Sequence, residues 1–423
     1  MSTTCILFPA ELLDAFDERG WSWGYLNMRH DQIQGVATVA QAWNNDRESV
    51  QRLDGLRSED RHYLRTADVR PFSGIWYRAD PDLHLLHDQV QRRTDAAVPI
   101  DLFKSLVNGW AEPGSITPLV VTVTTPVAGI SAVTAWLVDR FQAVPQVVSV
   151  VDGRRKPLDI IRDEWPVDNL RQRRVTIVGV GSIGSAVADT LARAGIGTLA
   201  LVDYDRLEQR NLARHILNDR DLGRRKVDAL ADHLNSRDGA PAIETYPIDV
   251  LTETDLLRPL VASSDVVICA ADGVAARRVC NHVSRRARTP LVLAAVIEDG
   301  AFGEMIRVRN RTGCLFCLRL DQEERGVMNP EPNIDLGYGT GTTHRPMTAA
   351  PPDLTLMADL ASKAALSTLL ERGRWNQRLP GDYAVVGLQP KPDYPAPFDM
   401  GCAGDIRWLA LPDRRDDCPT CAS

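Results

Sequence analysis

Between residues 169 and 300, short apolar segments alternate with longer segments whose apolar positions recur at helical spacing. Short segments that are apolar throughout are typical of strands buried on both faces, and the longer ones are typical of amphipathic helices. The predicted strands are Val175–Val180, Leu199–Asp203, Asp265–Ala270 and Pro290–Val296, and the predicted helices are Ser185–Arg193, Arg224–Asn235 and Ala275–Arg286. This alternation predicts an α/β domain with a Rossmann-like, mostly parallel sheet that carries helices on both faces.

The pattern changes on both sides of this region. Downstream we expect mixed strands, one long helix and an irregular crossover loop over residues 318–352; the elements are Glu304–Val308, Leu354–Leu370, Tyr383–Leu388 and Ile406–Leu411. Upstream, residues 151–168 are polar and arginine-rich, which indicates a linker. We therefore expect a separate α+β domain over residues 1–150, the linker, and the α/β domain over residues 169–423.

One uncharged segment, Ser115–Val138, has the length of a membrane span. Pro118, Pro126 and several threonines interrupt it, and its apolar pattern changes after Pro126. We interpret it as a buried strand at Leu119–Thr124, a turn, and a helix that begins near Ala128. The N-terminal segment shows no basic stretch followed by an apolar stretch, the pattern of a signal peptide. We therefore expect a cytoplasmic protein without a membrane partner.

Composition adds two constraints. The 423 residues carry a net charge of −7, which does not favour a nucleic-acid partner. Among 49 basic residues only five are lysines, and Lys226 is the only one between Lys156 and Lys363. This scarcity makes Lys226 a candidate for a specific role.

The chain has a Gly-x-Gly-x-x-Gly sequence, with Gly179, Gly181 and Gly184, between the first predicted strand and its helix. Glycines in this position let backbone N–H groups approach a nucleotide phosphate at a helix N-terminus. The following strand ends in two carboxylates, Asp203 and Asp205. One of them is suited to ribose hydroxyls and the other to Mg²⁺ beside a triphosphate, although a strand-end aspartate such as Asp203 often only caps a turn.

Asn211, Arg214 and Lys226 come next, and all three suit phosphate oxygens. Arginine binds a phosphate through two parallel hydrogen bonds, and lysine supplies a compact charge. So many charged groups exceed what hydride transfer requires. The sequence therefore favours ATP over a nicotinamide dinucleotide, although the dehydrogenase interpretation stays open on the glycines alone.

In order and spacing these motifs resemble the ThiF/MoeB/HesA group of adenylyltransferases, relatives of ubiquitin-activating enzymes. Their pattern continues after the glycines with Asp-x-Asp, Asn-Leu-x-Arg-Gln, Gly-x-x-Lys and Asp-Asn-x-x-x-Arg. This chain matches it over residues 169–421 but has His215 for the glutamine and Gly273 for the asparagine after Asp272, with Arg277 retained. We interpret His215 as a helix-packing residue.

The resemblance implies an ATP-dependent enzyme in which Arg214, Lys226 and Asp272 are catalytic and Asp272 or Asp205 holds Mg²⁺. It also implies a homodimer in which an arginine acts across the interface. The arginine motif of the family is absent here, which leaves Arg162 or an arginine within residues 171–174 as a substitute.

The eight cysteines include two C-x-x-C pairs, Cys314/Cys317 and Cys418/Cys421. Two such pairs can complete a tetrahedral four-sulfur zinc site, and the family places pairs at these points, so the resemblance implies a structural zinc. Two separate redox motifs are the alternative. We expect Cys269 and Cys280 in buried elements and Cys5 in the core or at the terminus.

Many relatives carry an acyl-accepting cysteine in the crossover loop, whereas residues 318–352 contain none. This absence indicates an enzyme that stops at the acyl-adenylate or passes it to an external nucleophile. Cys402 is a candidate replacement, although we expect it to have a packing role.

The N-terminal domain faintly resembles a JAB/MPN isopeptidase domain. Trp76 is followed by Tyr-Arg-Ala-Asp-Pro rather than the metal-binding histidines, and Trp23 stands where the upstream glutamate is expected. This departure implies an inactive scaffold. His84 and His87 lack a third ligand, and we expect them to be exposed or capping residues.

From the resemblance we expect the chain to activate a carboxylate, that of a ubiquitin-like or sulfur-carrier protein, as an acyl-adenylate. Activation of a peptide or RNA-linked carboxylate in a biosynthetic pathway is an alternative. A non-catalytic partner subunit of an activating enzyme is another, but in such subunits the nucleotide-site residues are typically eroded.

Overall fold

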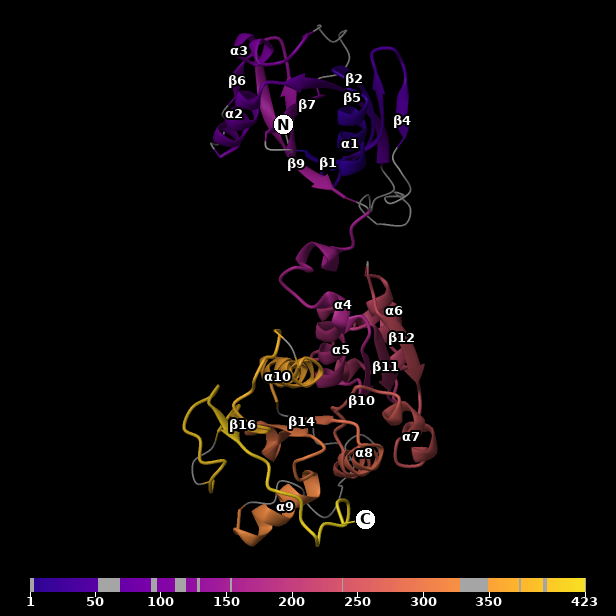
Figure 1. Cartoon of the computed structure of the whole chain (residues 1–423), viewed down its shortest axis with the longest axis vertical. Coiled ribbons are helices and arrows are strands. Elements are labelled where there is room, and N and C mark those ends of the chain that lie inside the picture. Colours follow the sequence, from indigo (N-terminus) through magenta and orange to yellow (C-terminus); the bar gives the residue numbers. More distant parts are fainter. Residues whose placement is uncertain are drawn as a thin grey trace. The chain divides into compact units, whose positions relative to one another are not determined.

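The computed structural model describes residues 4–51, 69–92, 97–110, 119–127, 130–152, 154–237, 239–327, 349–372, 374–390 and 394–422. It divides into two compact units, Met1–Arg155 and Lys156–Ser423 (Figure 1). Each unit has its own sheet and its own hydrophobic core. Among the residues described here, no helix is long and apolar enough to cross a membrane.

The first unit is built on a nine-stranded sheet that closes on itself. Its strands are β1 (Cys5–Pro9), β2 (Trp23–Asp31), β3 (Val36–Asn44), β4 (Ser49–Gln51), β5 (Val69–Ala79), β6 (Val98–Pro99), β7 (Leu119–Val127), β8 (Ile130–Val138) and β9 (Gln142–Val151). The ring runs β1-β3-β2-β5-β7-β8-β9, and β1 closes it by pairing with both β3 and β9. A closed ring leaves fewer free strand edges, which would otherwise pair with other chains.

Three helices complete this unit: α1 (Ala10–Glu18), α2 (Pro81–Gln91) and α3 (Ile100–Ser105). The apolar face of α1 packs into one core, where Phe16 stacks on Trp76 with 3.9 Å between ring centroids. The side chains of α2 and α3 pack into a second core around Trp136. The two cores contain alternate residues of the same strands, as the pleat of a β-strand requires.

The predicted helix near Ala128 is wrong, because residues 130–138 form strand β8. This strand pairs antiparallel with β7, for example Leu119 with Leu137. Val133 and Ala135 enter one core and Trp136 the other, so both faces of β8 are buried. A strand that is apolar on both faces lacks the alternation that distinguishes it from a helix.

The second unit contains an eight-stranded sheet in the order β12-β11-β10-β13-β14-β15-β16-β17. The strands are β10 (Arg174–Val178), β11 (Thr198–Val202), β12 (Ala242–Tyr246), β13 (Val266–Cys269), β14 (Leu291–Ile297), β15 (Phe302–Val308), β16 (Tyr383–Gly387) and β17 (Ile406–Leu409). Strands β10 to β14 are parallel, and β15 to β17 are antiparallel to their neighbours. The α/β class predicted from the sequence is confirmed.

Helices cover both faces of this sheet. Their bounds are α4 (Val167–Leu170), α5 (Ser182–Ala194), α6 (Lys226–Asn235), α7 (Thr254–Ala262), α8 (Val274–Ala287), α9 (Leu315–Glu324) and α10 (Pro351–Leu369). Helices α5, α6 and α10 pack on one face, and α7, α8 and α9 pack on the other. The order β10-α5-β11 places the glycine loop at the carboxyl end of the central parallel strands, where open α/β sheets bind their ligands.

The irregular loop expected over residues 318–352 begins later than predicted, because residues 318–324 belong to α9. The loop also ends earlier than predicted, because α10 starts at Pro351. Proline at the first helical position is favourable because its missing N–H would have no helical partner. Residues 328–348 lie outside the described part of the chain.

Candidate active site

The glycine loop joins β10 to α5, and two of its glycines are required by close backbone contacts. Gly179 has φ +81°, and a Cβ there would lie 2.7 Å from the backbone of Ala271. A Cβ on Gly184 would lie 1.8 Å from the carbonyl oxygen of Gly179. Both positions therefore exclude any side chain.

Gly181 has a different role, because a Cβ built there would meet no atom within 4 Å. It is the residue before α5, whose first backbone N–H groups have no helical acceptor. Open space beside free N–H groups at a helix N-terminus suits an anion. The glycine loop therefore has the geometry of a phosphate site.

Asp203 holds this loop from the neighbouring strand. Its Oδ2 accepts the N–H of Val180 at 2.8 Å, and its Oδ1 accepts the N–H of Asp205 at 2.8 Å. Burial raises the pKa of Asp203, although Lys226 and the two N–H donors oppose the rise. Both oxygens are thus used in bracing the backbone, which is the turn-capping role that the sequence left open.

Lys226, the first residue of α6, lies against the other carboxylate. Its Nζ is 2.7 Å from Oδ2 of Asp205, and its side chain is only 8% exposed whereas that of Asp205 is 48% exposed. Burial alone would lower the pKa of Lys226, but Asp203 and Asp205 outweigh it and raise the pKa. The lysine therefore stays charged, and the exposed side of Asp205 remains available to a ligand.

Arg214 and Asp272 belong to the same electrostatic group. The surrounding protein raises the pKa of Asp272 by desolvating it, and Arg214, Lys226 and Arg277 oppose this rise. Nε of Arg214 is buried without a partner, and within the described residues the guanidinium makes no ion pair. An arginine without a carboxylate partner beside a phosphate site is free to bind an oxyanion.

Asn211 does not point its acceptor toward this group. Its Oδ1 accepts the N–H of Glu208 at 2.9 Å and so caps the short 3₁₀ helix Gln209–Asn211. The structure thus places Asn211 in support of the loop that carries Arg214.

His215 is buried, as a packing residue would be, but it belongs to no helix. Its Nε2 lies 2.8 Å from the carbonyl oxygen of Val180, and its Nδ1 accepts the N–H of Leu217 at 3.2 Å. The interpretation as a helix-packing residue is therefore wrong in its location: His215 contacts the glycine loop.

The titration of His215 leads to a prediction about acid stability. Burial, assisted by nearby Lys226 and His233 and opposed by the hydrogen bond to Val180 and by Asp221, lowers the pKa of His215 to about 4. An exposed histidine titrates near pH 6.5, so the unfolded chain takes up this proton first as the pH falls. The contribution of neutral His215 to the free energy of unfolding is complete above about pH 6.5 and decreases toward pH 4. At pH 5 the folded protein has lost about 2 kcal/mol of this contribution.

We expect His215→Gln to lose less thermal stability than the wild type between pH 7.5 and pH 5. Thermal unfolding followed by circular dichroism measures the difference. His87, whose pKa burial also lowers, titrates in both proteins and cancels in the comparison. Equal losses in the two proteins would contradict the prediction.

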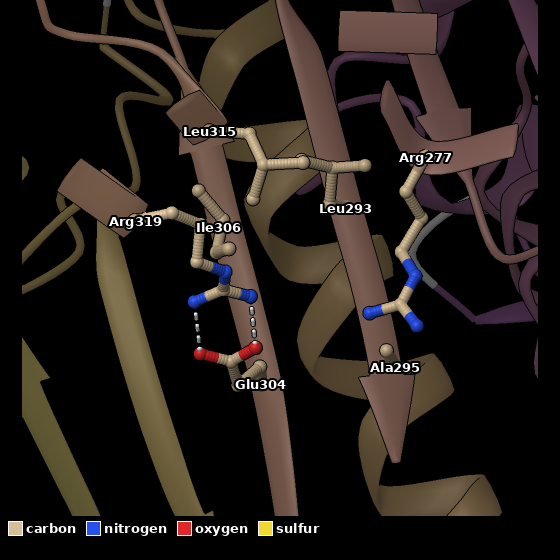
Figure 2. A pocket seen from close by; sticks show the side chains of 7 residues that line it. All are labelled: Arg277, Leu293, Ala295, Glu304, Ile306, Leu315 and Arg319. Atoms are coloured by element: carbon tan, nitrogen blue, oxygen red, sulfur yellow. Dashed lines mark hydrogen bonds and ion pairs between the residues drawn. The ribbon is translucent and has the colours of Figure 1, made fainter. Parts of the chain in front are cut away.

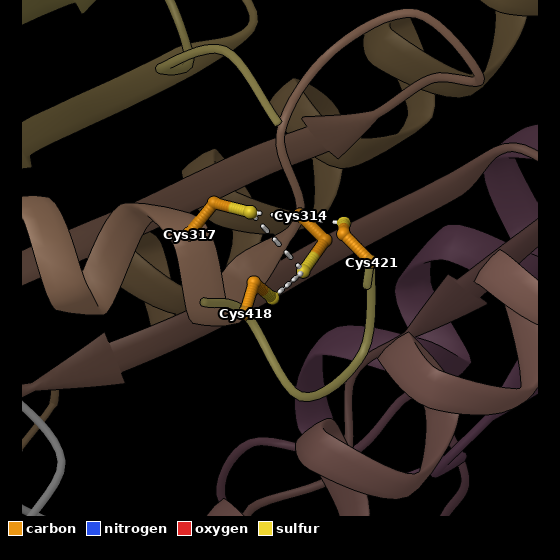
Figure 3. A group of neighbouring side chains, drawn as sticks. All are labelled: Cys314, Cys317, Cys418 and Cys421. Atoms are coloured by element: carbon orange, nitrogen blue, oxygen red, sulfur yellow. Dashed lines mark hydrogen bonds between the residues drawn. The ribbon is translucent and has the colours of Figure 1, made fainter. Parts of the chain in front are cut away.

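The four cysteines of the two C-x-x-C pairs come together although about a hundred residues separate the pairs (Figure 3). Sγ of Cys314 lies 3.9 Å from that of Cys317 and 3.6 Å from that of Cys418, and Cys317 lies 3.7 Å from Cys421. A tetrahedral ion with metal–sulfur bonds of about 2.3 Å has sulfur–sulfur edges of about 3.8 Å. The four thiols are therefore placed to hold one ion, and one shared cluster contradicts two separate redox motifs.

The other cysteines divide by burial. Cys269 and Cys280 are buried, as predicted, and Cys5 is half-buried. Cys402 is exposed in the turn before β17, so the predicted packing role is wrong. The backbone N–H of Cys402 donates to Oδ2 of Asp405 at 3.3 Å within this turn, and the Cys402 thiol does not enter the core.

Sequence reasoning missed a buried polar group on the antiparallel side of the sheet (Figure 2). Arg319 forms two hydrogen bonds with Glu304, at 3.0 and 2.6 Å, and the hydroxyl of Tyr383 donates to Glu304 at 2.6 Å. Burial would raise the pKa of Glu304, but Arg319 outweighs it and lowers the pKa. A single carboxylate within the apolar strand β15 was the available signal.

This ion pair lines a cavity of about 10 Å³, together with Arg277 and four apolar residues: Leu293, Ala295, Ile306 and Leu315. A cavity of this volume holds about one water molecule. It is therefore too small for a nucleotide or a peptide.

The arginines proposed to act across a dimer are all ion-paired within the chain. Arg162 and Arg171 contact Asp159, Arg173 contacts Asp265, and Arg174 contacts Glu244.

In the first unit, His87 is 4% exposed and its Nε2 lies 3.0 Å from the carbonyl oxygen of Gln146, so its predicted exposure is wrong. It packs edge-on against Trp136.

The glycine loop, the Asp203 brace, Lys226 and Arg214 form a candidate phosphate site at the carboxyl end of a mostly parallel α/β sheet, where such sheets bind their ligands. Residues 155–372, just over half of the chain, match the ThiF family. The chain therefore belongs to the ThiF family.

Proteins similar in sequence to this chain are named adenylyltransferases and activating enzymes. The molybdopterin-synthase adenylyltransferase of Escherichia coli (strain K12) is 35% identical over 169 residues, which are 38% of this chain and 67% of that protein. The SAMP-activating enzyme E1 of Haloferax volcanii is 33% identical over 160 residues, 38% of this chain and 58% of that protein. Among solved structures, a crystal structure of E. coli MccB with ATP is 21% identical with a TM-score of 0.45, covering 60% of this chain and 68% of that one.

Proposed function

We propose that the chain is an ATP-dependent adenylyltransferase that activates the C-terminal carboxylate of a ubiquitin-like or sulfur-carrier protein as an acyl-adenylate. The observation that carries the proposal is the group formed by Lys226, Asp205 and Arg214 near the glycine loop, in which Arg214 has no ion-pair partner among the described residues. Two cations and a partly exposed carboxylate suit a triphosphate and its counterion. Membership of the ThiF family and relatives named adenylyltransferases support the same activity.

In the proposed reaction a carboxylate oxygen of the substrate attacks the α-phosphorus of ATP. The bond from that phosphorus to the oxygen bridging the α- and β-phosphates breaks, and pyrophosphate leaves. Arg214 and Lys226 offset the charge that develops on the phosphates, and the N–H of Gly181 binds one of their oxygens. No protein nucleophile is required, so the chain acts by positioning and by electrostatics.

A magnesium ion fits the carboxylates of the site. Asp205 is half-exposed, and Asp272 is exposed although neighbouring protein groups partly desolvate its carboxylate, so both offer free oxygens. The oxygens of Asp203 already accept backbone N–H groups. Bound through Asp205 or Asp272, Mg²⁺ would neutralise charge on the leaving pyrophosphate.

The cysteine cluster fits a structural zinc ion. Its four thiols supply all four tetrahedral positions, so no position stays open for a substrate or a water molecule. The cluster joins the start of α9 to the C-terminal segment of the chain. We therefore assign it to stability and not to the reaction.

The proposal also assigns roles to the parts of the chain outside the nucleotide site. We propose residues 1–150 as a domain that binds the substrate or a dimer partner, with residues 151–168 as the linker to the adenylation domain over residues 169–423. A homodimer is part of this proposal.

A peptide or RNA-linked carboxylate is the second candidate substrate. A non-catalytic subunit is disfavoured, since Lys226 and Arg214 are retained in the sequence.

ATP–pyrophosphate exchange tests the function directly. Purified protein is incubated with ATP, Mg²⁺ and labelled pyrophosphate, with and without a candidate protein that ends in Gly-Gly. We expect labelled ATP only when the candidate is present. Exchange with a peptide instead would select the second substrate class, and no exchange with any carboxylate would contradict an adenylyltransferase.

Cys402 provides a prediction about where the reaction ends. If the enzyme stops at the acyl-adenylate, Cys402→Ser should exchange pyrophosphate at the wild-type rate. The wild-type protein should then form no thiol-sensitive adduct with the substrate on a non-reducing gel. The exposure of Cys402 makes this test informative, since the thiol is accessible. A thioester that disappears in the serine variant would overturn the prediction.

A further inference from the structure

His215 uses both nitrogens of its ring within a buried site. It is 8% exposed, Nδ1 accepts the N–H of Leu217 at 3.2 Å, and Nε2 lies 2.8 Å from the carbonyl oxygen of Val180. Because Nδ1 is an acceptor, the neutral ring carries its proton on Nε2 and donates it to Val180. The histidine therefore holds one carbonyl of the glycine loop in a defined direction.

The N–H of Val180 is held from another strand. It donates to Oδ2 of Asp203 at 2.8 Å, so side chains from two separate segments fix the two polar groups of this residue. A residue fixed at both its N–H and its C=O has little freedom to rotate about either neighbouring bond.

Fixing the carbonyl of Val180 also fixes the N–H of Gly181. The two groups share one planar peptide, and in a trans peptide they point in opposite directions. Within the described residues that N–H makes no backbone hydrogen bond, and the space beside Gly181 is open. The N–H of Gly181 therefore points away from the Val180 carbonyl and from His215.

We propose that His215 is a positioning residue for the nucleotide phosphates. It aims the Gly181 N–H at the phosphate and ties Arg214, its neighbour in the chain, to the glycine loop. His215 itself contacts no ligand. The inference rests on the proposed function in one respect, that the anion bound here is a phosphate of ATP.

Three substitutions separate the hydrogen bond from the volume of the ring. His215→Gln retains a donor and an acceptor on a side chain of similar length, His215→Asn retains them on a shorter side chain, and His215→Leu fills similar volume without either. Isothermal titration measures the dissociation constants of ATP and, separately, of inorganic pyrophosphate. His282→Ala is the matched control, because His282 is an exposed histidine on α8.

We expect His215→Leu to weaken the binding of ATP and of pyrophosphate about tenfold, the effect of losing one hydrogen bond. His215→Gln should bind within about threefold of the wild type, and His282→Ala should match it. Thermal unfolding of each variant distinguishes loss of positioning from loss of fold. If His215→Leu does not fold, the comparison of His215→Asn with His215→Gln takes its place, and we expect the shorter amide to bind more weakly.

A folded His215→Leu, or a folded His215→Asn in its place, that binds both ligands as tightly as the wild type would overturn the inference. Equal losses of affinity and of stability in all three variants would also overturn it, since that pattern marks a purely structural residue. A wild-type protein that binds pyrophosphate but not ATP would overturn the proposed function alone. In that case the His215 dependence of pyrophosphate binding still decides the inference.

Discussion

Lys226→Ala is expected to reduce the rate of ATP–pyrophosphate exchange by at least a factor of about 100, the usual effect of removing one group that stabilises a transition state. Lys226 is buried against Asp205, and the neighbouring carboxylates keep it charged. Without the cation, Asp205 and Asp272 would repel the phosphates of ATP instead of sharing a counterion with them. We therefore expect the KM for ATP to rise as well.

The control for this prediction is Lys363→Ala, since Lys363 is an exposed lysine on α10 outside the site. It should exchange pyrophosphate at the wild-type rate. Thermal unfolding of both variants shows whether the protein remains folded. A folded Lys226→Ala protein with exchange within about threefold of the wild type would mean that the charge acts elsewhere.

The second large effect concerns the cysteine cluster. We expect one zinc ion per chain by elemental analysis, and loss of that ion in Cys314→Ser and in Cys418→Ser. Both thiols are fully buried within the cluster. Because the ion joins α9 to the C-terminal segment, its loss should lower the Tm of the second unit by about 10 °C.

Cys402→Ser is the matched control here, because Cys402 is exposed and lies outside the cluster. It should retain one zinc ion and the wild-type Tm. A chelator that removes zinc from the wild type should reproduce the Tm of Cys418→Ser. Zinc retained in Cys418→Ser, or a Tm unchanged by its loss, would contradict a structural metal site.

The sequence was most informative where local pattern and chemistry coincide. The strands β10, β11, β13 and β14 were predicted because they are apolar throughout and are separated by amphipathic helices. The glycines were informative because a Cβ at Gly179 or Gly184 would clash with neighbouring backbone. Only glycine fits there, so the requirement is visible in the sequence. The sequence was misleading at residues 130–138, since burial on both faces removes the alternation that identifies a strand.

By itself, the sequence determined the α/β class, the phosphate motif and the residue types from which an ATP site is built. Only the tertiary structure decided how those residues divide the work. Asp203 and Asp205 are two positions apart, yet one braces the glycine loop and the other pairs with Lys226, because the end of β11 turns their carboxylates to different partners. The contact of His215 with Val180 spans 35 residues, and the contact of Cys314 with Cys418 spans 104, so packing and not local pattern sets both.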